Sequence, residues 1–451
     1  MKIFRSGLVS LLALSHLSIL NAAPLDEAIK NIEASGILRY RYYWSRGDTT
    51  EPQYQHWGGS SNPDGANQIA TYRMDMGLSG DVADNFNIFT HLGYASGDYS
   101  YGSKAKADTN KTFNLKQYFL TYSLSDYNTK IIAGRQAIDS IWAGPNIFTE
   151  GAGKNVYTGI VGMGTRFVTE INDAVSINVF GFDSWDWERA GLKRLENGKF
   201  SDNGSDIQAD VAPLVFKNFY GASLQNKFAL GDDSINPNLH IGYVPSKALL
   251  YAGSLSYETT FSELKYTGSL VYLGNSVGDL LKNSNFTNGN YVQLDGQFKY
   301  DVWDFRLGAL HYGDTNKKSF AVIEDQGSLD TGPGLDILYT NGSRLNGDLG
   351  RNTFTYFDIG YTFIKKLRLG FSTVYGGTKI SDNVSFKSYD GKGNEVTLVG
   401  QGGKKYELIG RISYAHTPKL SLSAFYAHTA IDRKGYDGSK HIARTQIFYR
   451  F

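Results

Sequence analysis

Apolar and polar residues alternate with a period of two from Ser35 to the last residue of the chain. At residues 303–307, for example, Trp303 and Leu307 lie on the face opposite Asp304 and Arg306. Successive side chains of a β-strand point to opposite faces, so this period predicts strands with one apolar and one polar face. A run of this length restricts the chain to an all-β fold.

Eighteen segments carry the alternation, and short and long connections follow each other between them. An even number of antiparallel strands is typical of single-chain bacterial outer-membrane barrels. We therefore predict a transmembrane antiparallel β-barrel of about 18 strands over residues 35–451, with long external connections such as 314–351 and 430–441. The predicted strands are 35–44, 68–79, 86–95, 113–124, 129–136, 160–169, 175–183, 218–228, 237–244, 248–257, 262–273, 290–300, 303–313, 352–363, 366–377, 404–415, 420–429 and 442–451.

A soluble β-sandwich would also alternate, because it has an apolar inner face and a polar outer face. Three features favour the barrel: Arg recurs on the polar face, Tyr and Trp lie near strand ends, and the last strand is aromatic and ends at Phe451. The 31 Tyr and 26 Phe, against 9 Pro, also fit aromatic girdles. We expect Phe451 to be the signal that the barrel-assembly machinery recognises.

The first 22 residues are predicted to be a cleaved signal peptide. Lys2 and Arg5 precede an apolar run from Leu8 to Leu20, and small residues follow it. The run is shorter than the roughly 20 residues that a membrane-spanning helix needs. We therefore expect export, and a single barrel domain at residues 23–451.

A short helix is predicted at residues 24–33, before the alternation begins. Pro24 suits a first helical position, and Leu25, Ile29 and Ile32 share one helical face.

The sequence carries no recognisable enzyme motif and no Cys. A Gly-x-Ser-x-Gly elbow, a phosphate-binding loop and a His-Glu-x-x-His motif are all missing, so we predict neither an enzyme nor a required cofactor. Removal of the signal peptide leaves 43 basic against 44 acidic residues. This near-neutral charge argues against a nucleic-acid partner.

Arginines recur on the predicted inward face of the strands. Guanidinium groups stay ionised, so they would keep a lumen wet and attract anions. Each could equally pair with a carboxylate such as Asp75, Asp304 or Glu407, and both interpretations stay open. This basic wall comprises Arg39, Arg41, Arg73, Arg135, Arg166, Arg306, Arg368, Arg411 and Arg444.

The third external connection, about residues 137–159, is predicted to fold into the barrel as a constriction. It carries apolar side chains that are unusual in a solvent-exposed loop, among them Ile141, Trp142 and Phe148. An inward fold would bury them and project carboxylates into the pore. The expected acidic side of the constriction consists of Asp139, Glu150, Glu324 and Asp325.

Several stretches resemble the major outer membrane porin family of Campylobacter. They are APLDEAIKNIEASGILRYRY (23–42), YGDTNKKSFAVIEDQGSL (312–329), YTNGSRLNGDLGRN (339–352), VYGGTK (374–379) and TPKLSLSAFY (417–426). The resemblance implies an eighteen-stranded homotrimeric porin that has a narrow constriction and prefers cations.

The resemblance also implies a structural calcium ion held by constriction carboxylates, and Glu324 and Asp325 match the family's acidic pair. The family shows an Asp where this chain has Thr158. A hydroxyl is a poorer ligand than a carboxylate for a hard cation. We therefore expect a weak calcium site or none.

The sequence predicts a water-filled channel in the lipid bilayer of a Gram-negative outer membrane, through which ions and small hydrophilic solutes diffuse passively. A function of another class is a surface adhesin or host-interaction barrel, whose contact surface would be the long polar connections. Conductance across a planar bilayer separates the two, because a plugged adhesin would carry no current.

Overall fold

The computed structural model describes residues 29–48, 67–98, 113–144, 161–186, 192–194, 200–202, 205–206, 218–323, 327–335, 337–339, 343–389, 395–399, 402–433 and 436–451. The expected signal peptide lies outside these ranges.

The strands of the main sheet follow the predicted alternation. They are β1 (Lys30–Asp48), β2 (Asn67–Ala83), β3 (Phe86–Asp98), β4 (Asn114–Leu124), β5 (Thr129–Ala137), β6 (Val161–Asn172), β7 (Val175–Asp186), β11 (Phe219–Asn226), β12 (Phe228–Leu230), β13 (Asp233–Val244), β14 (Ala248–Phe261), β15 (Leu264–Val277), β16 (Asn290–Tyr300), β17 (Trp303–Tyr312), β20 (Arg351–Phe363), β21 (Leu367–Lys379), β24 (Gly403–Ala415), β25 (Leu420–Arg433) and β26 (Tyr436–Arg450).

Shorter elements lie in the connections. They are η2 (Ser125–Tyr127), β8 (Leu192–Arg194), β9 (Phe200–Asp202), β10 (Ser205–Asp206), α4 (Asp279–Asn283), β18 (Lys318–Ser319), η3 (Ile337–Tyr339), β19 (Asp348–Leu349), β22 (Ser385–Tyr389) and β23 (Glu395–Val399). Among the described residues, no helix is both long and apolar enough to cross a membrane.

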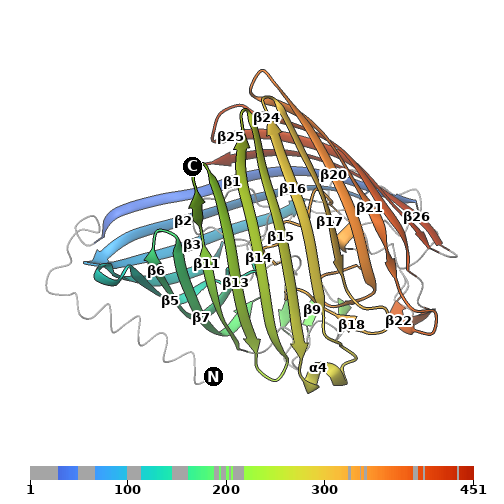
Figure 1. The fold of residues 1–451 in the computed structure, drawn as a ribbon, viewed down its shortest axis with the longest axis horizontal. Coiled ribbons are helices and arrows are strands. Elements are labelled where there is room, and N and C mark those ends of the chain that lie inside the picture. Colours follow the sequence, from blue (N-terminus) through green and yellow to red (C-terminus); the bar gives the residue numbers. More distant parts are fainter. Residues whose placement is uncertain are drawn as a thin grey trace.

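The main sheet closes into an antiparallel barrel (Figure 1). Neighbouring strands pair in chain order, and β1 pairs with both β2 and β26. Strands β11 and β12 occupy one position in the ring, because both pair with β13. The described strands therefore form the predicted barrel of 18 positions. Closure gives the backbone N–H and C=O groups of every strand a partner, which a membrane interior requires.

The predicted helix at residues 24–33 is wrong over its described part, because Lys30 to Glu33 form the start of β1. Lys30 pairs with Asp81 and Glu33 with Ser79, and the register shifts between them. Asn31 adopts a φ of 52°, and its Nδ2 donates to Oδ2 of Asp81 at 2.7 Å. Pairing with β2 through this bulge outweighs the local helical pattern.

The prediction of a long connection at residues 430–441 is also wrong. Strand β25 continues to Arg433 and β26 begins at Tyr436, with a continuous register between them. Ladder hydrogen bonds use only backbone groups, so polar side chains do not end the strands here.

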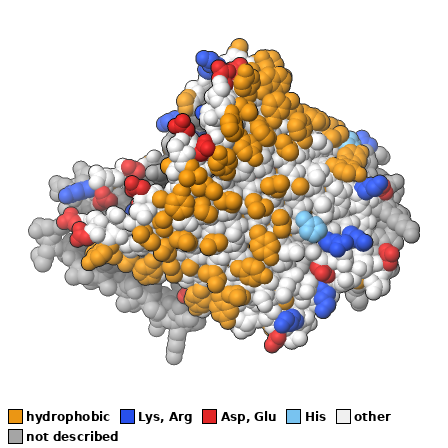
Figure 2. All heavy atoms as spheres, viewed as in Figure 1, with side chains coloured by type: hydrophobic (Ala, Val, Ile, Leu, Met, Phe, Trp, Pro, Cys, Tyr) orange, Lys and Arg blue, Asp and Glu red, His pale blue; other side chains and the backbone are white. Residues whose placement is uncertain are grey.

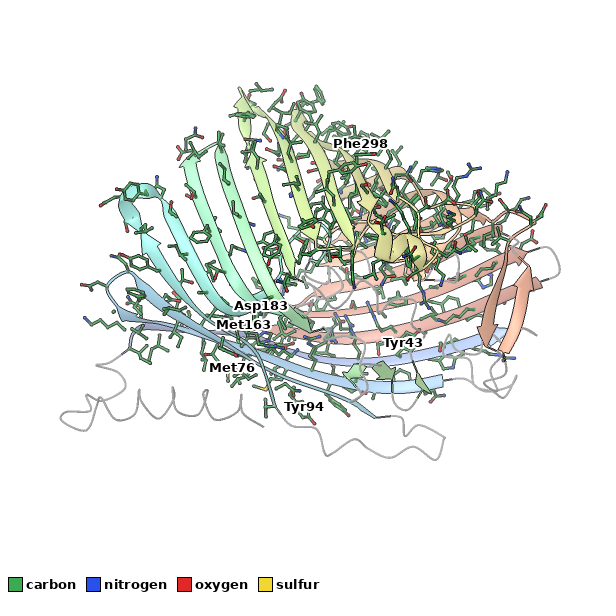
Figure 3. All side chains as sticks on the ribbon, turned by 90° about the horizontal axis from the view of Figure 1, so that it is seen from below. Tyr43, Met76, Tyr94, Met163, Asp183 and Phe298 are labelled. Carbon is green, nitrogen blue, oxygen red and sulfur yellow. The ribbon has the colours of Figure 1, made fainter. Side chains whose placement is uncertain are left out.

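The outward face of the barrel is hydrophobic, as predicted from the alternation. Figure 2 shows orange side chains over much of the visible wall. Figure 3 shows Phe298, Met76 and Tyr94 pointing away from the barrel and Tyr43 pointing into it. Leu369 and Phe371 are exposed on the outside, whereas Ser372 is buried inside. Exposed apolar residues at alternate positions suit contact with lipid.

We predict that substitution by arginine lowers the stability of the barrel at one of two adjacent residues of β15 and not at the other. Leu270 is 46% exposed on the outward face, and Ser269 lines the lumen. Leu270→Arg should destabilise the folded barrel by about 2–4 kcal/mol, because it places a cation near the middle of the lipid-facing band. Ser269→Arg should leave the stability nearly unchanged. Urea unfolding in lipid vesicles measures both, and equal losses would contradict the face assignment.

Candidate functional site

Two segments from different connections fold into the barrel and pack against each other. They are residues 138–144 and residues 320–345, of which 324–326, 336 and 340–342 are not among the described residues. The backbone N–H of Ile323 donates to the oxygen of Trp142 at 2.9 Å, and that of Ser328 donates to the oxygen of Ile141 at 3.2 Å. Gly327 has a φ of 59°, and a Cβ there would overlap the oxygen of Ile141. The second segment therefore needs glycine at this contact.

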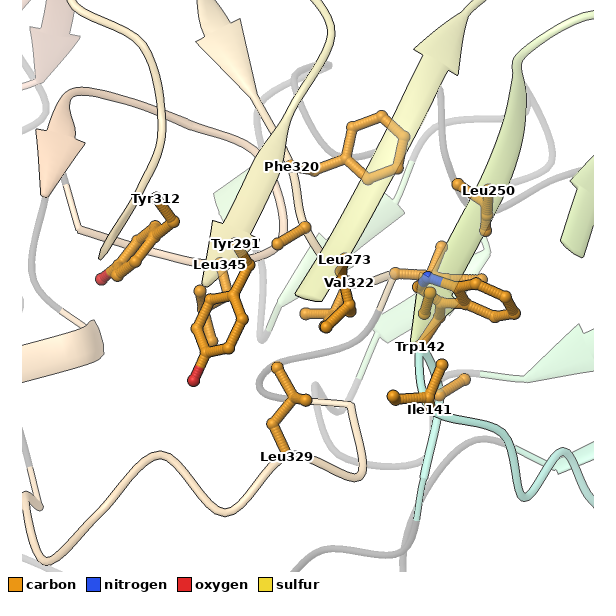
Figure 4. Packing of buried hydrophobic residues seen from close by; sticks show 14 of the residues in the cluster. Ile141, Trp142, Leu250, Leu273, Tyr291, Tyr312, Phe320, Val322, Leu329 and Leu345 are labelled. Atoms are coloured by element: carbon orange, nitrogen blue, oxygen red, sulfur yellow. The ribbon is translucent and has the colours of Figure 1, made fainter. Parts of the chain in front are cut away.

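Apolar side chains hold both segments against the inner wall, as Figure 4 shows. Trp142 is 1% exposed. Its ring centroid lies 6.3 Å from that of Phe219 and 6.2 Å from that of His240. A Cβ on Gly242 would approach the indole to 2.9 Å, so this glycine makes room for Trp142 on β13. The packing fixes the first segment across the lumen.

A cavity of about 430 Å³ remains between these segments and strands β6 to β17. Its charged lining residues, among those described, are two arginines and three aspartates: Arg166, Arg306, Asp139, Asp295 and Asp330. The uncharged polar lining consists mostly of small hydroxyl and amide groups: Ser140, Ser176, Asn178, Ser223, Gln225, Ser254, Ser269, Gln293, Gln297 and Ser328. Such a lining can replace part of the water shell of a small polar solute.

Arg166 and Asp139 form the first charge pair of the cavity. Nη1 of Arg166 lies 3.7 Å from Oδ2 of Asp139, and its Nη2 donates to the backbone oxygen of Ala137 at 3.2 Å. The guanidinium also lies over the rings of Phe180 and Phe182, at 5.8 and 5.9 Å. The arginine side chain is 9% exposed and that of Asp139 is 46% exposed. The cation is thus held in the wall, and the carboxylate faces the cavity.

Arg306 is the centre of a second network. Its Nε donates to Oδ2 of Asp295 at 2.7 Å, and its Nη1 donates to Oδ1 of Asp330 at 3.0 Å. The hydroxyl of Tyr356 donates to Asp295 at 2.6 Å. Nε2 of Gln293 donates to the backbone oxygen of Asp330 at 2.6 Å. The bonds to Asp330 attach the second inward segment to β16 and β17, and the bond from Tyr356 joins β20 to β16.

The same segment is attached again a few residues further along the chain. Both carboxylate oxygens of Glu407 accept the backbone N–H of Leu335, at 3.1 and 3.0 Å. Arg411 donates to the backbone oxygen of Pro333 and lies 3.8 Å from Asp358. Since bonds to charged groups are stronger than neutral ones, the segment is firmly positioned.

Pairing accounts for much of the predicted basic wall. Arg368 donates to Asp304 at 2.9 Å and to Asp358 at 3.0 Å. Arg73 pairs with the fully buried Asp75, which also lies 3.0 Å from His91 and 3.1 Å from Lys116.

The other wall arginines contact polar or aromatic groups. Arg41 donates to Gln446, and Arg135 donates to the backbone oxygen of Lys116. Arg444 lies over the ring of Phe425. Arg39 lies directly opposite Arg73 of β2 in the backbone ladder.

Of the expected acidic residues, the structure brings Asp139 to the cavity beside Arg166, and Glu150, Glu324 and Asp325 lie outside the described residues. Sequence reasoning missed Asp295 and Asp330. Asp295 alternates with the outward Leu294, so its inward face was visible in the sequence. Asp330 lies in a connection where apolar and polar residues do not alternate, so no sequence pattern indicated its position.

No group of three or more His, Cys, Asp or Glu residues suited to a metal ion occurs within the described part of the chain. The expected calcium ligands Glu324 and Asp325 lie outside it, as does Thr158.

Comparisons with known proteins agree with this geometry. The family model described as Campylobacter major outer membrane protein matches residues 1–451. The fold is similar to a BenF-like porin from Pseudomonas fluorescens Pf-5, with 11% identity, a TM-score of 0.61, and coverage of 94% of this chain and 99% of that one. It is also similar to Acinetobacter baumannii OccAB4, with 12% identity, a TM-score of 0.58, and coverage of 93% and 98%. At these identities the likeness shows the fold alone. None of the curated proteins compared with the chain matches it.

We predict that Trp142→Ala widens the cavity without opening the barrel. The substitution removes the largest buried side chain of the first inward segment, and such truncations cost about 3–5 kcal/mol locally. Single-channel conductance should rise. Trp303→Ala is the control, because Trp303 is 39% exposed on the outward face and should leave the conductance unchanged. Equal conductance in both variants would contradict the role of Trp142.

Proposed function

Because the chain belongs to the Campylobacter major outer membrane protein family, we propose that it is an outer-membrane porin, through which ions and small hydrophilic solutes diffuse passively. A closed barrel with a hydrophobic outer face and a polar inner cavity supports this proposal. Passive diffusion needs no reaction chemistry and no energy source. The proposal needs only a wet path and side chains that select among solutes.

One observation supports a preference for cations, which is part of the proposal. In two of the three ion pairs of the described lining, the carboxylate is more exposed than its guanidinium partner; the exception is Asp295, which is 3% exposed beside Arg306. Asp330 is 58% exposed beside Arg306 at 17%, and Asp139 is 46% exposed beside Arg166 at 9%. A passing ion therefore meets carboxylate oxygens before it meets the arginines. Rings of acidic side chains favour cations in channels for the same reason.

We predict that Asp330→Asn and Asp139→Asn each lower the preference for cations. A cation about 4 Å from a unit negative charge in a water-like medium gains about 1 kcal/mol and an anion loses as much, so the cation-to-anion permeability ratio should fall by up to about 30-fold. Reversal potentials across a salt gradient measure the ratio. Asp279→Asn is the matched control, because that side chain is 95% exposed on α4 in a connection. A ratio unchanged in both cavity variants would contradict the proposal.

The second candidate function is a surface adhesin. The long connections at one end of the barrel are its support, since they would offer a contact surface. Purified protein in a planar bilayer distinguishes the candidates. Discrete current steps support the porin, and a bilayer that stays silent would favour the adhesin.

Homotrimer assembly, a cleaved signal peptide and recognition of Phe451 by the assembly machinery stay proposals. The resemblance supports the first, and the sequence pattern supports the others. The backbone of Phe451 exchanges two hydrogen bonds of 3.1 Å with Gly36, so the last residue also belongs to the seam between β26 and β1.

Calcium binding rests on Glu324 and Asp325 and on the family resemblance. Because Thr158 replaces a carboxylate, we predict that calcium raises the melting temperature of the protein little or not at all. Melting is measured with calcium and with chelator, for the native chain and for the double variant Glu324→Gln, Asp325→Asn. A calcium-dependent rise in the native chain that the double variant lacks would show a site after all.

A further inference from the structure

Three basic side chains stand together on the outside of the barrel, at the rim that carries the long connections. Arg351 begins β20, Lys379 ends β21 and Lys404 lies at the start of β24. They line one hollow of about 540 Å³ with Thr353, Gly377 and the other residues Thr378, Ile380, Asp382, Gly402 and Gly403. Figure 2 shows charged side chains, basic and acidic, together with histidines at the right of the visible wall, beyond the hydrophobic band.

The strand register places these cations on the outward face. Arg351 pairs with Lys379 and Thr353 with Gly377. Gly377 also pairs with Lys404. Outward residues of the same strands include the exposed Phe371 and Tyr375. The hollow therefore lies on the outer surface of the wall and does not belong to the lumen.

None of these three cations forms an ion pair with a described carboxylate, in contrast to Arg306 and Arg368 of the lumen. Asp382 lines the hollow, and Asp432 lies opposite Lys404 in the ladder, yet no ion pair joins either to the three cations. Arg351 and Lys379 are direct cross-strand neighbours, and like charges in that position destabilise a sheet. A bound anion between them would remove this cost.

The hollow has other features of an anion site. Gly377 places no side chain between the cations, and a Cβ there would approach the oxygen of Gly403 to 2.6 Å. The hydroxyl of Thr353 lies beside the cations and is hydrogen bonded to the ring of His311 at 2.8 Å. Arginine and lysine are the side chains that bind phosphate oxygens in proteins, the arginine through a planar fork and the lysine as a point charge.

The position of the hollow along the strands indicates the source of the anion. Tyr375 and Tyr406 are 55% and 38% exposed on the outward face, as residues of an aromatic girdle are. Lys379 lies four residues beyond Tyr375, which is about 13 Å along the strand. The hollow thus lies where lipid headgroups begin. Long connections of bacterial outer-membrane barrels face outward, so these headgroups belong to the outer leaflet.

We propose that Arg351, Lys379 and Lys404 form a binding site for a phosphate group of the outer-leaflet glycolipid, with Thr353 as an additional hydrogen-bonding group. The acyl chains of the same lipid would lie along the apolar band below the girdle. The site is separate from the channel and does not depend on the porin function.

The test measures binding of lipid A to the purified full-length protein by native mass spectrometry in detergent. Wild-type protein should retain the lipid, and the triple variant R351Q/K379Q/K404Q should bind it on the order of 100-fold more weakly, as expected for the loss of three cations at a charged lipid surface. The matched control is K299Q/K365Q/K419Q, which removes three exposed cations at the opposite rim. It should bind like the wild type.

Two further probes identify the ligand. Lipid A without its phosphates should bind wild type and triple variant equally weakly, and inorganic phosphate alone should not compete at equal concentration. Unchanged affinity in the triple variant would overturn the proposal, as would equal binding of the dephosphorylated lipid. Tight binding of inorganic phosphate would overturn the lipid assignment. If the triple variant does not fold, Lys379→Gln alone should weaken binding about fivefold, and unchanged binding would count against the site.

Discussion

The hydrogen bonds that join β1 to β26 are the constraint on which the rest of the structure depends. In a bilayer, an unpaired backbone N–H or C=O costs several kcal/mol, and a sheet with two free edges would leave a row of them on each side. Pairing from Ile37 with Arg450 to Asp48 with Ser439 removes both edges. Only the closed ring gives the chain an inside, and the inward segments and the cavity exist because of it.

Charge inside that ring is tolerated because it is paired. A guanidinium moved into a wall of low dielectric loses much of its hydration, and a carboxylate within hydrogen-bonding distance returns part of the energy. Arg306 shows how pairing also organises the lumen, since it bonds Asp295 on the wall and Asp330 on the inward segment. Arg306 and Arg166 thus act as anchors, and the more exposed carboxylates Asp330 and Asp139 face the cavity. Of the two interpretations that the sequence left open for the wall arginines, pairing holds for Arg166 and Arg306.

The strands and their outward and inward faces could be predicted from the sequence. One face of each strand lies against lipid, so a shift of the register by one residue would place polar side chains there, and the alternation of apolar and polar residues is therefore strict. Prediction from the sequence failed where long-range pairing decides the outcome. Residues 30–33 follow a helical pattern but pair with β2. The bond between Arg306 and Asp295 is diagonal across β16 and β17, since Arg306 pairs with Gln297 in register, and register cannot be read from one strand. Asp330 lies in a connection with no period, so no pattern marked it.

The closing pair of strands also determines the order in which the molecule is built. Arg41 and Gln446 are hydrogen bonded although 405 positions separate them in the chain. Contacts of such high sequence separation carry a large loop-closure entropy and form late in folding. Strand β26 is the last strand of the ring in chain order, so the ring remains an open sheet until that strand is made and paired with β1. Residues 138–144 and 320–345 can then reach the inner face through the open side, before the seam encloses them.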